Sequence, residues 1–190
     1  MAGSRTARYH LAPARVGVDA HTTEANPMLP TLAVVVHVLP VFWLVAGIIG
    51  RDTCWAQAAR TDDLAALRAM AKLAGIFDRA MVRPATFVVL VTGLAVAPLR
   101  GWPILGFLQG GSVNWVLTAL LVYLSAIPLI FLVFLPKGRV YRRALEEANA
   151  SGVVTPALRA AINDPLVGAA RGYEFVMIAV LTWLMIAKPF

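Results

Sequence analysis

The chain has 190 residues, of which 59% are hydrophobic and only 14% are charged, and its mean hydropathy is +0.74. A globule of this size cannot bury so many apolar side chains, so the composition excludes a soluble protein. The net charge of +7 does not indicate nucleic acid, because the basic residues lie beside apolar runs rather than among stacking aromatic residues. Anionic lipid headgroups are the expected partner.

The first 27 residues form a tail that precedes every apolar run. This tail contains two prolines, three arginines and two histidines, and it lacks the short basic start and cleavage site of a signal peptide. We therefore expect an uncleaved extracytoplasmic tail over residues 1–27 and a single membrane domain over residues 28–190. Cys54 is the only cysteine, which excludes an intramolecular disulfide and a cysteine-pair metal site.

Four apolar runs predict transmembrane helices, because a helix crosses the hydrocarbon core with about 20 residues. Strand-like alternation is absent from these runs, so a membrane barrel is excluded and an all-α, four-helix transmembrane bundle is expected. The two shorter runs reach full length if Arg83 snorkels and Glu174 lies at the interface. The predicted spans are about 28–50, 82–99, 113–136 and 170–188.

The segments between the spans predict short amphipathic helices. Thr61 with the acidic residues after it is typical of a helix N-cap, as are Thr155 before Pro156 and Asp164 before Pro165. Within the spans, Pro40 and Pro128 are expected to kink or loosen the helices. The small residues spaced four apart predict close helix packing, and they are Ala46 with Gly50 and Gly93 with Ala97.

The distribution of basic residues predicts the orientation. Residues 51–83 and 136–171 hold twelve of the 17 lysines and arginines. The positive-inside rule therefore predicts that both long loops lie in the cytoplasm and both termini lie outside.

His37 is the only ionisable residue between Met28 and Gly50. It lies roughly 13 Å into the first span and shares a helical stripe with Val41, Leu44, Ile48 and Arg51. Three interpretations stay open: a neutral imidazole bonded to a hydroxyl or to a carbonyl freed by Pro40, a haem or metal ligand, and a proton-transfer group. No second histidine occurs in a predicted span, so a two-histidine haem site within one chain is not expected.

Polar residues at a matching depth on the other helices predict a pocket around His37. Thr92 and Thr182 are its expected members, with Gly93 and Thr118 nearby. At the cytoplasmic side, Arg171 and Glu174 are three residues apart and predict an interfacial charge pair on one helix face, or a polar pocket for an anionic headgroup or propionate. The sequence contains no catalytic motif of a soluble enzyme class, which favours a non-enzymatic protein.

Three short groups of residues carry a family resemblance: His37, Val38, Leu39, Trp43 and Gly47, then Asp78, Val82, Pro84, Thr92 and Gly93, and finally Met185, Lys188 and Pro189. On these residues the chain resembles a bacterial family of predicted integral membrane proteins of unknown function, the domain family numbered 2269, over roughly residues 30–190. The resemblance implies four transmembrane helices in the bacterial inner membrane and no defined activity.

More distantly, the chain is similar to membrane protoporphyrinogen oxidases and copper-resistance D proteins, a resemblance that assigns a haem role to His37. The third span departs from that pattern because it has no Lys or His. The leading hypothesis is therefore an accessory or assembly subunit of a larger membrane complex, with partner membrane subunits or a homo-oligomer. The alternatives are a haem-associated redox protein using His37 and a small-solute transporter.

Overall fold

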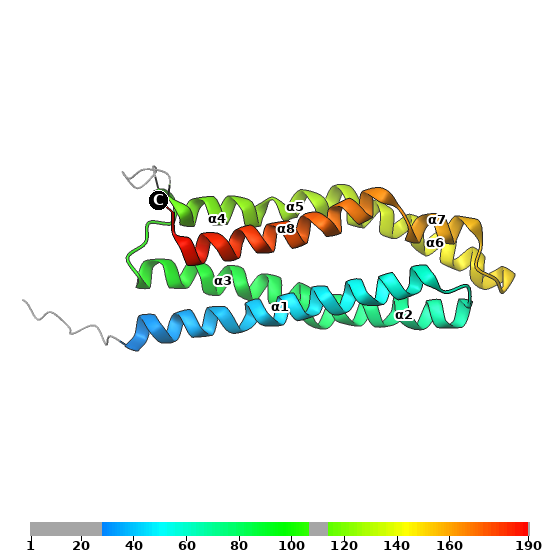
Figure 1. Cartoon of the computed structure of the whole chain (residues 1–190), viewed down its shortest axis with the longest axis horizontal. Helices are drawn as coiled ribbons and strands as arrows, with labels where there is room; N and C mark the ends of the chain where they lie inside the picture. Colours follow the sequence, from blue (N-terminus) through cyan, green and yellow to red (C-terminus); the bar gives the residue numbers. More distant parts are fainter. Residues whose placement is uncertain (1–27, 107–113, 190) are drawn as a thin grey trace, which may run out of the picture.

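The computed structural model describes residues 28–106 and 114–189, and every regular element in these two ranges is helical. Four helical rods form two long hairpins that lie side by side (Figure 1). Each rod is long and apolar enough to cross a membrane. The predicted all-α fold with four spans is thus confirmed.

The first hairpin packs one unbroken helix against a helix that contains a π-helical turn. Its elements are α1 (Met28–Arg60), α2 (Leu64–Phe77), the π-turn η1 (Asp78–Val82) and α3 (Arg83–Leu99). The second hairpin consists of α4 (Trp115–Leu124), α5 (Ala126–Leu129), the π-turn η3 (Ile130–Phe134), α6 (Leu135–Ser151), α7 (Pro156–Ile162) and α8 (Pro165–Ala187).

Prolines explain where the rods depart from regular helix. Each π-turn ends two residues before a proline, Pro84 or Pro136, which lacks an N–H and whose ring crowds the carbonyl four residues earlier. Pro128 is preceded by a turn at Ser125, as the predicted loosening requires. Pro40 differs from the prediction in one respect, because α1 continues through it as regular helix.

Side-chain caps start the helices outside the predicted spans. Thr155 and Asp164 cap α7 and α8 as predicted. The cap of α2 is Asp63 rather than Thr61, because the Asp63 carboxylate accepts from the Ala65 N–H while the Thr61 hydroxyl accepts from the Asp63 N–H. The Lys137 ammonium also forms an ion pair with the Asp164 carboxylate, with Nζ and Oδ2 2.7 Å apart. This bond from Lys137, together with the bonds from the helix amides, holds the pKa of the Asp164 carboxyl below its ordinary value.

The rods are longer than a membrane requires. They contain 32 to 37 residues each, which corresponds to about 48–56 Å of helix against a hydrocarbon core of about 30 Å. The surplus lies at the end where α1 turns into α2 and α6 into α7 (Figure 1). We call residues 52–81 and 137–169 the extension. The sequence predicted separate short helices there, and the structure instead continues three of the four spans into it without a break.

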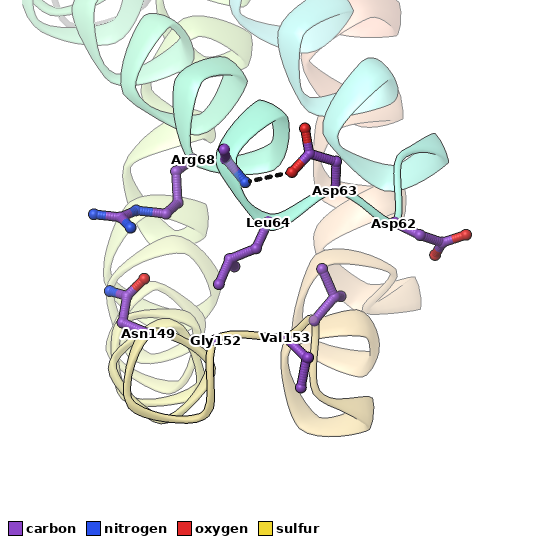
Figure 2. A pocket seen from close by; sticks show the side chains of 9 residues that line it. Asp62, Asp63, Leu64, Arg68, Asn149, Gly152 and Val153 are labelled. Carbon is purple, nitrogen blue, oxygen red and sulfur yellow. Dashed lines mark hydrogen bonds between the residues drawn. The ribbon is translucent and has the colours of Figure 1, made fainter.

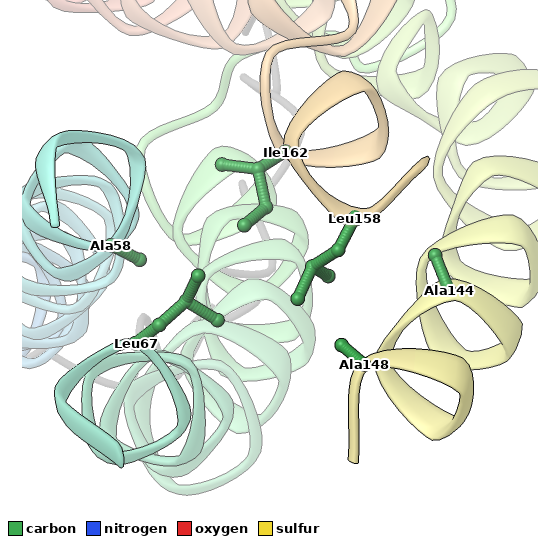
Figure 3. Packing of buried hydrophobic residues seen from close by; sticks show 6 residues of the cluster. All are labelled: Ala58, Leu67, Ala144, Ala148, Leu158 and Ile162. Atoms are coloured by element: carbon green, nitrogen blue, oxygen red, sulfur yellow. The ribbon is translucent and has the colours of Figure 1, made fainter. Parts of the chain in front are cut away.

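The extension has a hydrophobic core of its own, drawn from both hairpins (Figure 3). Leu67 of α2 and Leu158 of α7 are fully buried at its centre. Alanines on α1 and α6 allow the helices to approach them closely. The cluster consists of Ala58, Leu67, Ala144, Ala148, Leu158 and Ile162.

Glycines bring α1 close to its partner within the first hairpin. A Cβ atom added at Gly47 would lie 2.7 Å from the Cβ of Met81, and one added at Gly50 would lie 2.6 Å from the ring of Phe77. Gly47 is required, because the Met81 Cβ cannot move without its backbone, whereas a side chain at Gly50 would force the Phe77 ring to shift. Gly50 therefore packs as predicted, whereas its predicted partner Ala46 is exposed.

Candidate functional site

His37 lies on the buried stripe of α1 and is 8% exposed. Its Nδ1 atom is 2.9 Å from the hydroxyl oxygen of Thr92 on α3. Thr92 has a single hydroxyl hydrogen, and it donates that hydrogen to the Val88 carbonyl at 2.7 Å. The Thr92 oxygen therefore accepts from His37, which requires the proton of a neutral imidazole to be on Nδ1.

This tautomer leaves the other ring nitrogen, Nε2, with a free lone pair. No hydrogen-bond partner for Nε2 occurs among residues 28–106 and 114–189. The ring is held against Gly93, where an added Cβ would lie 3.0 Å from His37 Cε1. Thr92 and Gly93 thus orient an imidazole whose Nε2 can accept a proton or bind a metal.

The predicted polar pocket is only partly assembled. Thr92 contacts His37, but Thr182 is exposed and donates to the Ile178 carbonyl of its own helix at 2.8 Å. Thr118 likewise donates to the Asn114 carbonyl of its own turn. Placing Thr182 in this pocket was wrong, because equal depth does not decide which way a helix face is turned.

A self-contained metal site is not formed by the described part of the chain. No group of three or more His, Cys, Asp or Glu side chains gathers in residues 28–106 and 114–189. His10 and His21 lie outside the described residues. A metal or haem bound by His37 would therefore take its other ligand from the tail, a partner subunit or solvent.

A second polar centre joins the two hairpins where the spans meet the extension. Arg51 donates to Asp52 at 2.9 Å and to Glu174 of α8 at 2.5 Å. Arg171 of α8 lies 3.8 Å from the same Asp52 carboxylate. The side chains of Arg51, Asp52 and Glu174 are 10%, 15% and 14% exposed. Two cations and two anions thus balance in a nearly buried network.

The network corrects the predicted pair of Arg171 and Glu174. Both side chains lie at the expected end of the last span, but their ion pairs run across to α1 rather than to each other. Arg171 also stacks over the Trp55 ring at 5.2 Å, and Trp55 packs edge-on against Tyr141 of α6. The four charges therefore bridge the hairpins.

Sequence reasoning missed Arg51 and Asp52 as functional partners. Arg51 was placed on the His37 stripe, where the structure does bury it together with Leu44 and Ile48. The sequence does contain a pattern that could have predicted the network, namely opposite charges at matching depth. Arg51 and Asp52 lie at the end of the first span, and Arg171 and Glu174 lie at the start of the last.

Two further polar contacts link the hairpins. The Tyr123 hydroxyl of α4 donates to the Thr86 carbonyl of α3. Arg159 of α7 donates to the carbonyls of Ala59 and Thr61, each at 2.8 Å, and pairs with Asp62. Within the spans, the Tyr123 contact adds to packing as a source of helix association. The Arg159 contacts lie in the extension and join the hairpins there.

Comparison with known proteins gives a family for this chain. The profile of DUF2269, described as a predicted integral membrane protein, matches residues 31–189. No curated protein and no solved structure matches the chain significantly. The more distant resemblance to protoporphyrinogen oxidases and copper-resistance D proteins stays a prediction.

Proposed function

We propose that this chain, which belongs to the DUF2269 family of predicted integral membrane proteins, is a non-enzymatic accessory or assembly subunit of a larger membrane complex. The observation that carries this proposal is the extension. A protein that only crosses the membrane needs no ordered helices beyond it, yet this chain builds a hydrophobic core there from both hairpins. Such a platform presents a fixed surface to a partner.

The proposal also includes the side of the membrane on which the extension lies. The extension with its flanking arginines holds most of the basic residues of the chain, and by the positive-inside rule this supports a cytoplasmic extension with both termini outside. Arg83 has a 70% exposed side chain at the start of the second span, where it can reach anionic headgroups. The partner surface is then cytoplasmic.

Isolation of the native complex tests this role. The full chain is tagged and expressed at its natural level. It is crosslinked in the membrane, extracted in a gentle detergent, and sized by native mass spectrometry. We expect an assembly heavier than the monomer with a constant stoichiometry. A monomer alone, without any crosslinked product, would contradict the proposal.

His37 favours a second candidate, a haem-associated membrane component. The free Nε2 lone pair of a neutral imidazole, oriented by the Thr92 hydrogen bond, is a donor that would hold haem iron. Haem would supply electron transfer when bound. The residues of the chain would orient the ligand through Thr92 and keep the ring in place on Gly93.

An absorption spectrum of the purified chain decides this candidate. We expect a Soret band that His37→Ala removes and an affinity for haem that falls about tenfold or more in Thr92→Val, because the tautomer is no longer held. Thr182→Val is the matched control, since that hydroxyl bonds only its own helix. A sample without a Soret band, or a band that survives His37→Ala, excludes the haem role.

A further inference from the structure

An open groove runs along the extension between α2 and α6. It consists of two adjoining cavities of about 470 Å³ each, and Arg68 and Asn149 line both of them. Figure 2 shows the first cavity, with Arg68 and Asn149 on one side and Leu64 and Val153 below the turn of α2. The second cavity adds Lys72, Tyr141 and Leu145.

The second cavity of the groove is lined by two cations and by no acidic residue. Arg68 and Lys72 lie one turn apart on α2, both are exposed, and neither forms an ion pair within residues 28–106 and 114–189. The acidic residues Asp62 and Asp63 line only the first cavity, where Asp62 pairs with Arg159 and Asp63 caps α2. An anionic occupant therefore meets two available cations.

The groove also presents a buried hydroxyl that lacks a partner. The Tyr141 oxygen is inaccessible to solvent and, among the described residues, is the fully buried side-chain oxygen or nitrogen that lacks a hydrogen bond. A phenol is a donor at neutral pH, and a buried donor without an acceptor is costly. An occupant that offers a carboxylate oxygen would remove this cost once the Tyr141 hydroxyl turns toward the groove.

Lipid headgroups lie too far away to be that occupant. Arg68 precedes Val82, the start of the second predicted span, by 14 residues of nearly continuous helix, which corresponds to about 21 Å. The headgroup region on each side of a bilayer is only about 5–8 Å thick. The groove therefore faces the aqueous phase.

We propose that the groove between α2 and α6 binds an acidic segment of a partner protein, with Arg68 and Lys72 pairing its carboxylates and the Tyr141 hydroxyl donating to one of them. The groove is open and elongated, with apolar walls at Leu64, Leu145 and Val153. This shape suits a linear segment, since a small molecule is usually enclosed. The inference rests on the proposed accessory role and identifies the chemistry of the partner.

Peptide titration tests the groove. The full chain in nanodiscs of uncharged phosphatidylcholine is titrated into a fluorescein-labelled tetraglutamate peptide, with tetralysine as the control peptide, and anisotropy is measured. We expect saturable binding of tetraglutamate only. Arg68→Ala with Lys72→Ala should weaken it about tenfold. Tyr141→Phe should weaken it as well without lowering the stability of the free protein.

The matched control is Arg142→Ala with Arg143→Ala, which removes two exposed cations of α6 that do not line the groove. An equal loss of tetraglutamate affinity in the two double variants would mean that the peptide is attracted by the overall positive charge and not by the groove. That result would overturn the proposal. Displacement of the peptide by inorganic phosphate, beyond the effect of sodium chloride at equal ionic strength, would indicate a small-anion site and also overturn it.

Failure of this inference and failure of the accessory role are distinguishable. If the native complex survives Arg68→Ala with Lys72→Ala, the groove is not its docking site, although the accessory role stands. If the chain is isolated only as a monomer but tetraglutamate binding depends on Arg68 and Lys72, the accessory role falls and the groove still binds acidic segments.

Discussion

Replacing Arg51 by alanine is expected to destabilise the protein by about 3–5 kcal/mol, because it leaves Glu174 and Asp52 nearly buried with their strongest cation removed. The free energy of unfolding is measured by titrating the chain from mild detergent micelles into dodecyl sulfate. The loss should appear as separation of the two hairpins, since the contact between Arg51 and Glu174 joins α1 to α8.

Arg83→Ala is the matched control for Arg51→Ala. Arg83 also pairs with a carboxylate, that of Asp78 at 2.6 Å, but its side chain is 70% exposed. Its removal should cost at most about 1 kcal/mol. The double variant Arg51→Ala with Glu174→Ala should be more stable than Arg51→Ala alone, because no carboxylate is then left unpaired on α8. Equal effects of Arg51→Ala and Arg83→Ala would contradict the assignment of this network as the joint between the hairpins.

Leu158→Ala is expected to destabilise the extension by about 2–5 kcal/mol, because Leu158 is fully buried where α7 meets α2 and α6. Hydrogen exchange with mass spectrometry measures the effect. Amides of residues 64–77 and 139–162 should exchange faster, whereas those of residues 86–96 within the second span should keep their protection.

Leu166→Ala is the control for Leu158→Ala, since Leu166 is 50% exposed and its truncation should change stability by no more than about 0.5 kcal/mol. Under the proposed function, Leu158→Ala should also release the partner while the chain stays in the membrane. Unchanged exchange in the extension would contradict the view that this cluster is its core. Partner binding that persists after the extension has opened would argue against the platform.

The two polar centres, the network around Arg51 and the site at His37, have different roles in the protein. The network around Arg51 uses all four of its charges on one another, so it explains how the hairpins are joined and leaves no free group for chemistry. His37 has one nitrogen engaged by Thr92 and one without a partner among the described residues. Of these two centres, only His37 therefore has a group left over for binding a ligand.

Much of the architecture could be predicted from local sequence. Apolar runs of sufficient length predicted the four spans, and short-range signals at Thr155 and Asp164 predicted the helix starts, because a cap depends only on residues two or three positions away. The cap of α2 was predicted two residues too early. Thr61, Asp62 and Asp63 are all capable caps, so the residue type alone did not decide among them.

The sequence by itself determined that this chain is a four-helix membrane protein of its family, since hydropathy, helix length and cap chemistry act over a few residues. Only the tertiary structure decided that Glu174 pairs with Arg51, that Thr182 turns away from His37, and that the spans continue into a packed extension. Each of these depends on the rotation and relative height of helices far apart in the chain, which no local pattern encodes.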